Sequence, residues 1–338
     1  MQLRHCVLAI TAAISISAHA ADSINLGSYT VSGIYALDIL GGTGGGISGL
    51  EASAVTYARD RGSLFFVGDE GTGVVEISLT GQTLGSMAFN WTNSGSTKHD
   101  TEGLTYLGGG VLVVSEERLY DAYRFNYASG GTANLAASSV SISNANVGNS
   151  GLEGISYDPR NGSFVTIKQE NPQDIQSGSL SFAAGAAGTA VMSQLFNPAL
   201  MGLSTLSDVQ TLSPVDRLVG SNGADNLLVL SLGSRRLIEV TRTGEIKSSF
   251  DLTDILAHNG IEGVTVDEKG SIYLVAEQLQ DAFAVGVANP QSQLIVLTAP
   301  VPEPQTYALL LAGLGLLALK TWRSGFRGRR QVEHANAG

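Results

Sequence analysis

The hexapeptide Leu152-Glu153-Gly154-Ile155-Ser156-Tyr157 recurs along the chain and decides its fold. Close copies are TEGLTY at 101–106 and IEGVTV at 261–266, and weaker copies are ASAVTY at 52–57 and LSDVQT at 206–211. Successive copies lie 49, 51, 54 and 55 residues apart when the following positions are taken as equivalent: Ser53, Glu102, Glu153, Ser207 and Glu262. A fixed period in this range indicates a solenoid or a propeller.

Each copy continues through a polar turn into a second β-rich run that ends in carboxylates or amides. These runs are residues 63–70, 111–117, 163–170 and 271–277. Third strands follow at 74–79 and 236–240. Four strands in about fifty residues make one propeller blade. We therefore predict an all-β domain over residues 21–300, a β-propeller of five blades, with six blades as the alternative because 171–205 and 279–300 are poorly patterned.

Two segments outside the repeat complete this prediction. The β-rich stretch 24–31 is expected to pair with 293–297 in the last blade and so close the ring, which protects edges that would otherwise aggregate. Residues 251–257 are the only short helical candidate in the domain.

The N-terminus has the pattern of a secretory signal peptide. Arg4 precedes an apolar run over 6–16, and small residues end at Ala18-His19-Ala20. Residues 1–20 are therefore expected to be removed by signal peptidase. The only cysteine, Cys6, leaves with them, so the mature chain can form neither a disulfide nor a thiolate metal site.

The C-terminus carries a second address. An apolar stretch over 307–319 predicts a hydrophobic helix, short for a transmembrane helix, and a basic segment follows. Residues 301–330 resemble the PEP-CTERM sorting signal, which implies processing by an exosortase-like enzyme, and 331–338 form a short tail. A simple membrane anchor is the alternative. The residues that carry this resemblance are Pro302, Glu303, Pro304, Arg327, Arg329 and Arg330.

The domain is strongly acidic. Residues 21–300 contain thirteen Lys and Arg against twenty-eight Asp and Glu, a formal net charge of −15. A field of this sign repels phosphate backbones and argues against binding of nucleic acid. It favours cations.

Acids recur at two places in the repeat, the start of the presumed inner strand and the end of the antiparallel strand that follows. Both places should lie at one mouth of the propeller. Crowded carboxylates repel one another, and a hard cation such as Ca²⁺, which takes six to eight oxygen ligands, relieves that repulsion. The candidate metal ligands are Glu51, Asp69, Asp100, Glu102, Glu116, Glu153, Glu170, Glu262 and Glu277.

A structural explanation of the same residues stays open. The Glu-Gly pair could serve as a turn device in which glycine permits an unusual backbone. The glutamate would then cap amides or pair with a basic residue of the next blade, and Lys98, Arg118 and Lys168 are near enough in sequence to compete.

The repeats resemble the SdiA-regulated (YjiK/CarP-like) family of bacterial envelope β-propellers over roughly residues 46–280. The motifs that carry this resemblance are residues 51–57, 67–70, 101–104, 114–117, 151–155 and 261–264. The resemblance implies a link to calcium and, for some members, phytase-like phosphatase activity. The fourth blade departs from the pattern because Leu232-Gly233 stands where an acidic pair is expected. We therefore expect a cation site away from the axis.

Two functions from different classes follow. The first is a noncatalytic Ca²⁺-binding module, exported and held at the cell envelope or extracellular surface, with an envelope or matrix component as partner. The second is a metal-dependent hydrolase, phytase-like or lactonase-like, for which His99 and His258 are the weak catalytic candidates. No G-x-S-x-G, H-E-x-x-H or P-loop motif accompanies these histidines.

Overall fold

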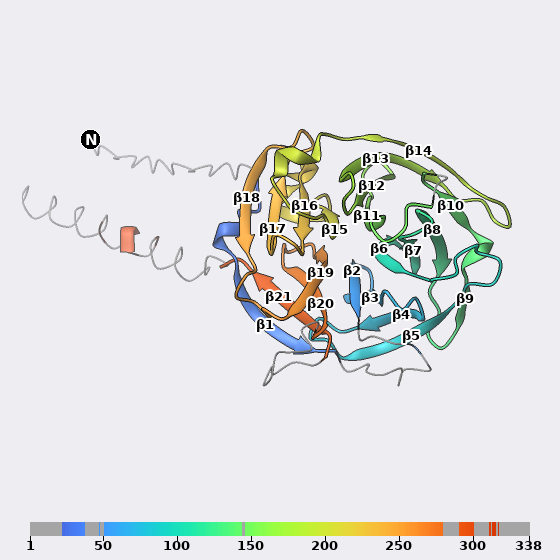
Figure 1. The fold of residues 1–338 in the computed structure, drawn as a ribbon. Helices are drawn as coiled ribbons and strands as arrows, with labels where there is room; N and C mark the ends of the chain where they lie inside the picture. Colours follow the sequence, from blue (N-terminus) through green and yellow to red (C-terminus); the bar gives the residue numbers. More distant parts are fainter. Residues whose placement is uncertain are drawn as a thin grey trace, which may run out of the picture. The chain divides into compact units, whose positions relative to one another are not determined.

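The computed structural model describes residues 22–37, 47, 51–143, 146–279 and 291–300, together with residues 311, 313–315 and 317. The chain divides into two compact units, Met1–Ala299 and Pro300–Gly338. The first unit contains five sheets in the described residues, each built on four antiparallel strands, which confirms the five-bladed propeller (Figure 1).

The blades follow one another along the chain, and each begins with its innermost strand. Blade 1 is β2 (Ala52–Ala58), β3 (Ser63–Gly68), β4 (Gly73–Ile77) and β5 (Thr83–Asn90), extended by the short parallel strand β9 (Thr132–Asn134). Blade 2 is β6 (Thr101–Gly108), β7 (Val111–Glu116), β8 (Asp121–Asn126) and β10 (Ser139–Ser141). Blade 3 is β11 (Leu152–Asp158), β12 (Ser163–Lys168), β13 (Asp174–Ser181) and β14 (Thr189–Gln194).

The other two blades complete the ring. Blade 4 is β15 (Asp208–Thr211), β16 (Leu227–Ser231), β17 (Arg236–Val240) and β18 (Ile246–Asp251). Blade 5 is β19 (Asn259–Val266), β20 (Ile272–Leu279), β21 (Gln293–Thr298) and β1 (Thr30–Ala36). Short 3₁₀ turns lie at Leu26–Ser28, Leu135–Ala137, Pro198–Met201, Asp216–Leu218 and Asn222–Asp225. The innermost strands β2, β6, β11, β15 and β19 stand around a common centre (Figure 1).

The hydrophobic core lies between blades, in five clusters that each join two neighbours. Strand β3 shows why. Its side chains alternate in direction, so Phe65 and Val67 pack toward blade 2, whereas Leu64 and Phe66 pack toward blade 5. A continuous apolar run is therefore buried on both faces, as the second strand of a propeller blade must be.

A repeated hydrogen bond links the inner strands. A hydroxyl oxygen in one strand accepts the backbone N–H of the next: Thr56 from Tyr106 at 3.1 Å, Thr105 from Tyr157 at 3.0 Å and Ser156 from Thr211 at 2.9 Å. Thr265 accepts from Tyr57 at 3.1 Å, which closes the ring from blade 5 to blade 1. Between blades 4 and 5 the side chain of Gln210 replaces this contact and accepts from the Thr265 hydroxyl at 3.0 Å.

The ring is closed by the N-terminal strand, as predicted, but with different bounds. Strand β1 pairs antiparallel with β21 from Thr30↔Thr298 to Ala36↔Gln293. The preceding residues are held by blade 4 instead. The backbone N–H of Ile24 donates to Glu239 at 3.1 Å, and that of Leu26 donates to Ser248 at 2.9 Å.

Residues 251–257, the short helical candidate, do not form a helix. Strand β18 runs to Asp251, and turns and bends follow. Arg235 donates to the carbonyl oxygens of Leu252, Ile255 and Leu256, which competes with the bonds a helix would need. Leu256 also has a φ of 45°, in the left-handed region that interrupts a right-handed helix.

The second unit is described at only a few positions. Residues 311, 313–315 and 317 are helical, and the predicted sorting residues lie outside the described part. Within the described residues, no helix is long and apolar enough to cross a membrane.

Candidate metal centre

Bulges at the start of the inner strands position the repeated glutamates. The pairing of β6 with β7 skips Glu102, and the pairings of β11 and β19 with their neighbours skip Glu153 and Glu262. Strand β2 skips Ser53 at the same place. A bulged residue is left out of the ladder, and bulges commonly redirect a side chain beside a functional site. The glycine after each glutamate therefore belongs to a strand and not to a turn.

A second repeated bond places another pair of residues at the same end of blades 1, 2 and 3. The backbone N–H of Asp69 donates to the carbonyl oxygen of Glu51 at 3.1 Å. Glu117 makes the same bond to Asp100 at 2.9 Å in blade 2, and Gln169 makes it to Gly151 at 3.1 Å in blade 3. The residue before the inner strand thus lies beside the residue after the second strand. Blades 1 and 2 fill both positions with acids, whereas blade 3 fills neither.

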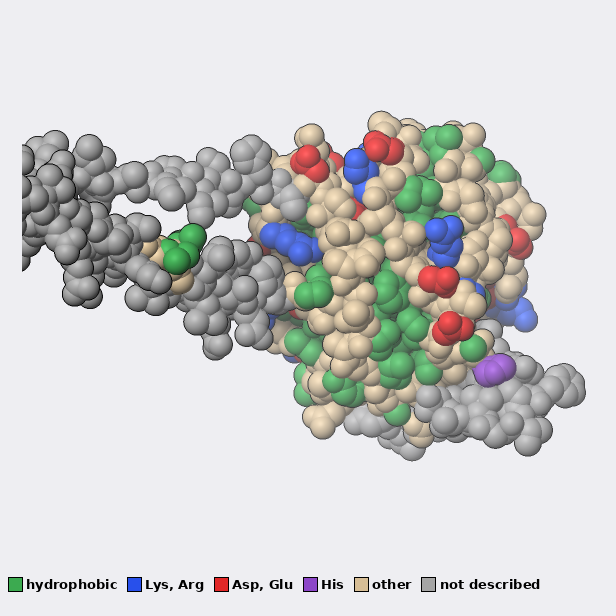
Figure 2. Space-filling view, turned by 90° about the vertical axis from the view of Figure 1, so that its left-hand side faces the viewer, with side chains coloured by type: hydrophobic (Ala, Val, Ile, Leu, Met, Phe, Trp, Pro, Cys, Tyr) green, Lys and Arg blue, Asp and Glu red, His purple; other side chains and the backbone are tan. Residues whose placement is uncertain are grey.

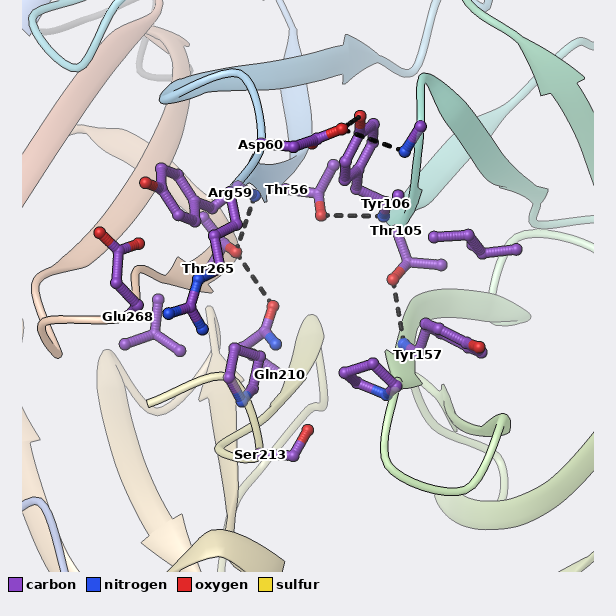
Figure 3. A pocket seen from close by; sticks show the side chains of 17 residues that line it. Thr56, Arg59, Asp60, Thr105, Tyr106, Tyr157, Gln210, Ser213, Thr265 and Glu268 are labelled. Carbon is purple, nitrogen blue, oxygen red and sulfur yellow. Dashed lines mark hydrogen bonds between the residues drawn. The ribbon is translucent and has the colours of Figure 1, made fainter. Parts of the chain in front are cut away.

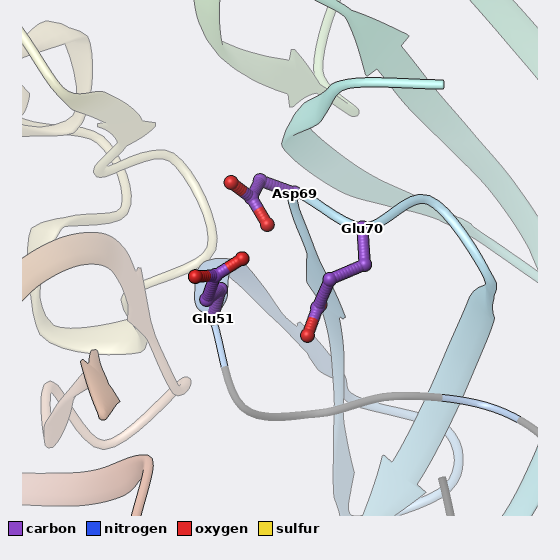
Figure 4. A group of neighbouring side chains, drawn as sticks. All are labelled: Glu51, Asp69 and Glu70. Carbon is purple, nitrogen blue, oxygen red and sulfur yellow. The ribbon is translucent and has the colours of Figure 1, made fainter. Parts of the chain in front are cut away.

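The carboxylates of blades 1 and 2 converge. Oxygens of Glu51, Asp69 and Glu70 lie within 4.8 Å of one another, and their side chains face the same space (Figure 4). Oxygens of Asp69, Asp100 and Glu102 form a second group within the same distance. Because Asp69 belongs to both groups, the two form one continuous acidic cluster that joins the blades.

Acids of blades 3 and 5 lie close enough to repel the acids of this cluster. Burial, followed by the charges of Glu153 and Glu262, raises the pKa of Glu102 well above its usual range. Burial and the neighbouring Glu117 do the same for the pKa of Glu153. Burial and the charges of Asp69 and Glu51, offset in part by a hydrogen bond with Glu277, raise the pKa of Glu262 to about 7.

Asp69 lies among several other acids of this mouth. Burial, a hydrogen bond with Glu51 and the charges of Glu51, Glu70 and Glu277 raise its pKa to about 9. Its Oδ1 atom is buried and has no hydrogen-bond partner among the described residues. An acceptor in this state is costly unless a proton or a cation satisfies it.

Arg118 and Lys168, two of the basic residues named as competitors, compensate little of this charge. Arg118 does reach the mouth, and its Nε lies 2.5 Å from Oδ2 of Asp100. Lys168 instead donates to the backbone carbonyls of Glu170 and Pro172. The side of the molecule shown in Figure 2 carries acidic and basic side chains interspersed. The concentration of acids at the mouth is not repeated on this side of the molecule.

Two of the predicted ligands, Glu116 and Glu170, lie outside the two groups of converging oxygens. Glu116 accepts from the Ser96 hydroxyl at 2.8 Å and from the backbone N–H of Leu119 at 2.7 Å, so both of its oxygens serve the fold. The Glu170 carboxylate lies 3.5 Å from the Ser150 hydroxyl. Neither residue belongs to the two groups of converging oxygens.

Glu117 is an acid of the cluster that the sequence comparison missed. It accepts from the backbone N–H of Gly151 at 3.1 Å and is hydrogen-bonded to Glu153. Counting residues from the start of each repeat could have identified Glu117. Asp69, Glu117 and Glu277 stand fifteen or sixteen positions after Ser53, Glu102 and Glu262, respectively, whereas Glu116 stands fourteen after Glu102.

Blade 4 contributes no acid at the corresponding positions, since Ser207 and Leu232 occupy them. It has Asp208 where the other blades have glycine or Ala54. Asp208 is buried, and its carboxylate accepts from the backbone N–H groups of Val209 at 2.8 Å and Val264 at 2.7 Å. Burial raises its pKa well above the usual range. The cluster is therefore asymmetric and is built from four blades.

The two histidines differ in their surroundings. The ring of His99 stacks on Trp91, with centroids 5.0 Å apart and planes 9° from parallel. Trp91 and His99 line an open cavity of ≈ 660 Å³, and Glu70 of the acidic cluster also lines it. His258 is exposed in the loop before β19.

Comparisons with known proteins place these features in a family. The model of the SdiA-regulated family matches residues 35–279, and that of the PEP-CTERM protein-sorting motif matches residues 300–330. Together the two matches cover the repeats and the C-terminal address.

Solved structures match this chain at low identity. A luciferin-regenerating enzyme matches at 11% identity and a TM-score of 0.46, covering 78% of this chain and 94% of the other. A streptogramin B lyase matches at 12% identity and a TM-score of 0.45, covering 82% and 100%. Virginiamycin B lyase from Staphylococcus aureus matches at 13% and 0.38, covering 73% and 66%. At these scores the similarities carry no argument about activity.

Proposed function

The chain belongs to the SdiA-regulated family, and from this premise we propose that it is a noncatalytic calcium-binding propeller, a binding or surface module of the cell envelope. The observation that carries the proposal is Asp69. Its carboxylate is shared by two groups of converging acids, and one of its oxygens is buried without a hydrogen-bond partner among the described residues. A bound cation would satisfy that oxygen and relieve the repulsion around it.

The donor set fits calcium. The converging atoms are carboxylate oxygens, which hard cations prefer. Calcium–oxygen distances of about 2.3–2.6 Å place two ligands on opposite sides of one ion about 4.6–5.2 Å apart. The separations within each group, at most 4.8 Å, are compatible with that span. Glu51, Asp69 and Glu70, or Asp69, Asp100 and Glu102, would hold the ion, which would supply positive charge and fix the loops between blades 1 and 2.

Export and retention follow from the two ends of the chain. The PEP-CTERM motif implies export, processing by an exosortase-like enzyme and retention at the envelope. We propose that residues 1–20 act as the signal peptide and that the mature propeller meets an envelope or matrix component there.

Calcium binding is tested by calorimetry on the metal-free protein. We expect Ca²⁺ to bind and to raise the melting temperature, with Mg²⁺ weaker because it demands a smaller octahedral site. Asp69→Asn should weaken Ca²⁺ binding at least about tenfold, since one tenfold step needs only about 1.4 kcal/mol. Glu245→Gln is the matched control because Glu245 is exposed and lies outside the cluster.

The outcome that would reject the proposal is equally direct. If Ca²⁺ gives no binding heat and no thermal shift, or if Asp69→Asn binds Ca²⁺ as the unchanged protein does, the acidic mouth is not a calcium site.

A metal-dependent hydrolase is the second candidate function. Its specific support is the cavity of ≈ 660 Å³ that joins Glu70 to the stacked Trp91 and His99, since it offers room for the organic part of a substrate beside the cluster. Ca²⁺-dependent turnover of phytate or a simple lactone, lost in Asp69→Asn and retained in Glu245→Gln, would favour this function. Absence of turnover in a protein that binds Ca²⁺ favours the noncatalytic module.

A further inference from the structure

The inner strands end, at the mouth opposite the acids, in a second cavity (Figure 3). Its volume is ≈ 720 Å³, and it is lined by the C-terminal ends of these strands and the loops that follow them. Pockets of about 300–1,000 Å³ hold small ligands. No residue of the acidic cluster lines this cavity, so the cavity is a candidate site separate from the proposed calcium site.

Three consecutive blades place a tyrosine at the same position of the repeat. These are Tyr57, Tyr106 and Tyr157, each half-buried. Tyr57 stacks on Tyr273 at a centroid distance of 6.4 Å, and Tyr106 stacks on Phe65 at 5.9 Å. Phe164 supports Tyr157 at 5.2 Å. Each ring is thus fixed from one side by another ring, which leaves rigid aromatic surface at the cavity wall.

The polar groups behind these rings are already satisfied by one another. The hydroxyls of Thr56, Thr105 and Thr265 accept backbone N–H groups of the next blade. The buried amide of Gln210 accepts from Thr265 at 3.0 Å and donates to the backbone carbonyl of Thr211 at 2.8 Å. The inner wall is therefore built by the fold and would need no reorganisation when a ligand enters.

Two carboxylates offer acceptors to a ligand. Asp60 accepts from the Tyr106 hydroxyl and from the backbone N–H of Gly109, both at 3.1 Å, which orients it at the rim (Figure 3). Glu268 lines the cavity and is hydrogen-bonded to Tyr57, while its Oε2 atom is buried without a hydrogen-bond partner among the described residues. A buried acceptor of this kind calls for a donor from elsewhere.

The charge of the lining excludes anions. Besides these two carboxylates the cavity is lined by one cation, Arg59, which is paired with Asp216 at 2.9 Å. A phosphate or a uronate would therefore meet net repulsion. A quaternary ammonium would need several rings within about 6 Å of one point. A cavity of ≈ 720 Å³ bounded by rings from three blades suits a broader ligand with many hydroxyl donors.

We propose that this tyrosine-lined mouth binds a neutral saccharide, whose C–H faces lie on Tyr57, Tyr106 and Tyr157 and whose hydroxyls donate to Asp60 and Glu268. Saccharides combine apolar faces with hydroxyl donors, and the cavity presents the complementary pair of rigid rings and carboxylate acceptors.

The proposal is tested by calorimetry with cellotetraose, maltotetraose and xylotetraose as neutral probes, tetragalacturonate as an anionic probe and choline as a cationic one. We expect at least one neutral tetrasaccharide to bind, unchanged by removal of Ca²⁺ with a chelator, and the charged probes not to bind. Insoluble cellulose and starch in a pull-down assay distinguish a chain within a polymer from a free oligosaccharide.

Variants assign the binding to this mouth. Tyr157→Ala should weaken it about tenfold or more, since the variant loses both the buried area of the ring and its contact with the saccharide face. Glu268→Gln keeps the shape of the side chain and should weaken it several-fold. Tyr35→Ala, at a half-buried tyrosine of the outer strand β1, is the control. The proposal is overturned if no neutral probe binds at concentrations up to about 10 mM, if choline or tetragalacturonate binds instead, or if both cavity variants bind as the unchanged protein does.

Discussion

Glycine at one position of the repeat lets neighbouring inner strands approach closely. A Cβ on Gly154 would lie 2.9 Å from both Cα of Asp208 and the backbone N of Val209. A Cβ on Gly263 would lie 2.9 Å from Cα of Ala54 in the next blade. The Glu-Gly pair therefore combines two roles that depend on each other. The glycine brings the strands together, and the bulged glutamates gather around the mouth as a result.

Gly154→Ala tests this close approach. The added methyl would meet backbone atoms of β15, which cannot yield as the end of a flexible side chain can, so we expect a loss of about 1–3 kcal/mol in the free energy of unfolding. Urea denaturation measures it. Gly27→Ala is the control, because its Cβ would make only an ordinary contact, 3.6 Å from Asn25. Equal stability of the two variants would show that the blades are not packed this tightly.

The crowded acids predict an unusual pH dependence for the metal-free protein. The pKa of Glu262 in the folded state is about 7, against an ordinary value of 4.5. Between these values the folded state holds more protons than the unfolded state, so the free energy of unfolding should fall as the pH rises from about 4.5 to 7. Urea midpoints in the presence of a chelator measure this decline. Glu262→Gln should flatten it, whereas Glu245→Gln should not, and a stability that rises over this range would contradict the assignment.

At the scale of the element, the ladder of hydroxyls joins each inner strand to the next without a shared sheet. Thr105 is buried, and its oxygen is the acceptor for the backbone N–H of Tyr157. The same residue type serves at Thr56 and Thr265, and serine serves at 156. The recurrence of a hydroxyl here is thus explained by hydrogen bonding between blades.

Thr105→Val removes this acceptor while keeping the shape of the side chain. The partly buried N–H of Tyr157 would lose this acceptor, which costs about 1–3 kcal/mol. We expect a corresponding loss in the free energy of unfolding by urea denaturation. Thr189→Val, on the exposed face of β14, should change stability by no more than about 0.5 kcal/mol. Similar losses in the two variants would mean that the ladder contributes nothing specific.

The elements also show what the sequence could and could not predict. The period and the hairpin turns predicted the blades because each blade repeats the same local problem of burying both faces of a strand. The helical candidate at 251–257 was wrong because Arg235, which lies outside this segment, donates to three of its backbone carbonyls. The local sequence of the segment does not show this contact. The sequence-based prediction named Glu116 as a candidate ligand and left out Glu117 for a related reason. Two adjacent acids on an extended chain point in opposite directions, and only the register with Asp100 decides which one enters the mouth.

At the scale of the whole molecule, the propeller presents two chemically different mouths on one frame. Acids gather where the inner strands begin, and tyrosines gather where they end. Both arrangements require that five blades stay in register around the ring. Strand β1 supplies the last strand of blade 5 from the opposite end of the chain, so both mouths depend on that single closure.

Closure can be tested by removing the strand and returning it as a peptide. A protein that begins at residue 38 leaves β21 as an unpaired edge and removes Ile24 and Leu26 from the core, so we expect aggregation and a lower melting temperature. A synthetic peptide of residues 22–37 should restore the melting transition in a concentration-dependent way, because it binds only the folded ring. A scrambled peptide of the same composition is the control. If the shortened protein melts like the full chain, or if the scrambled peptide restores it equally, β1 does not close the ring.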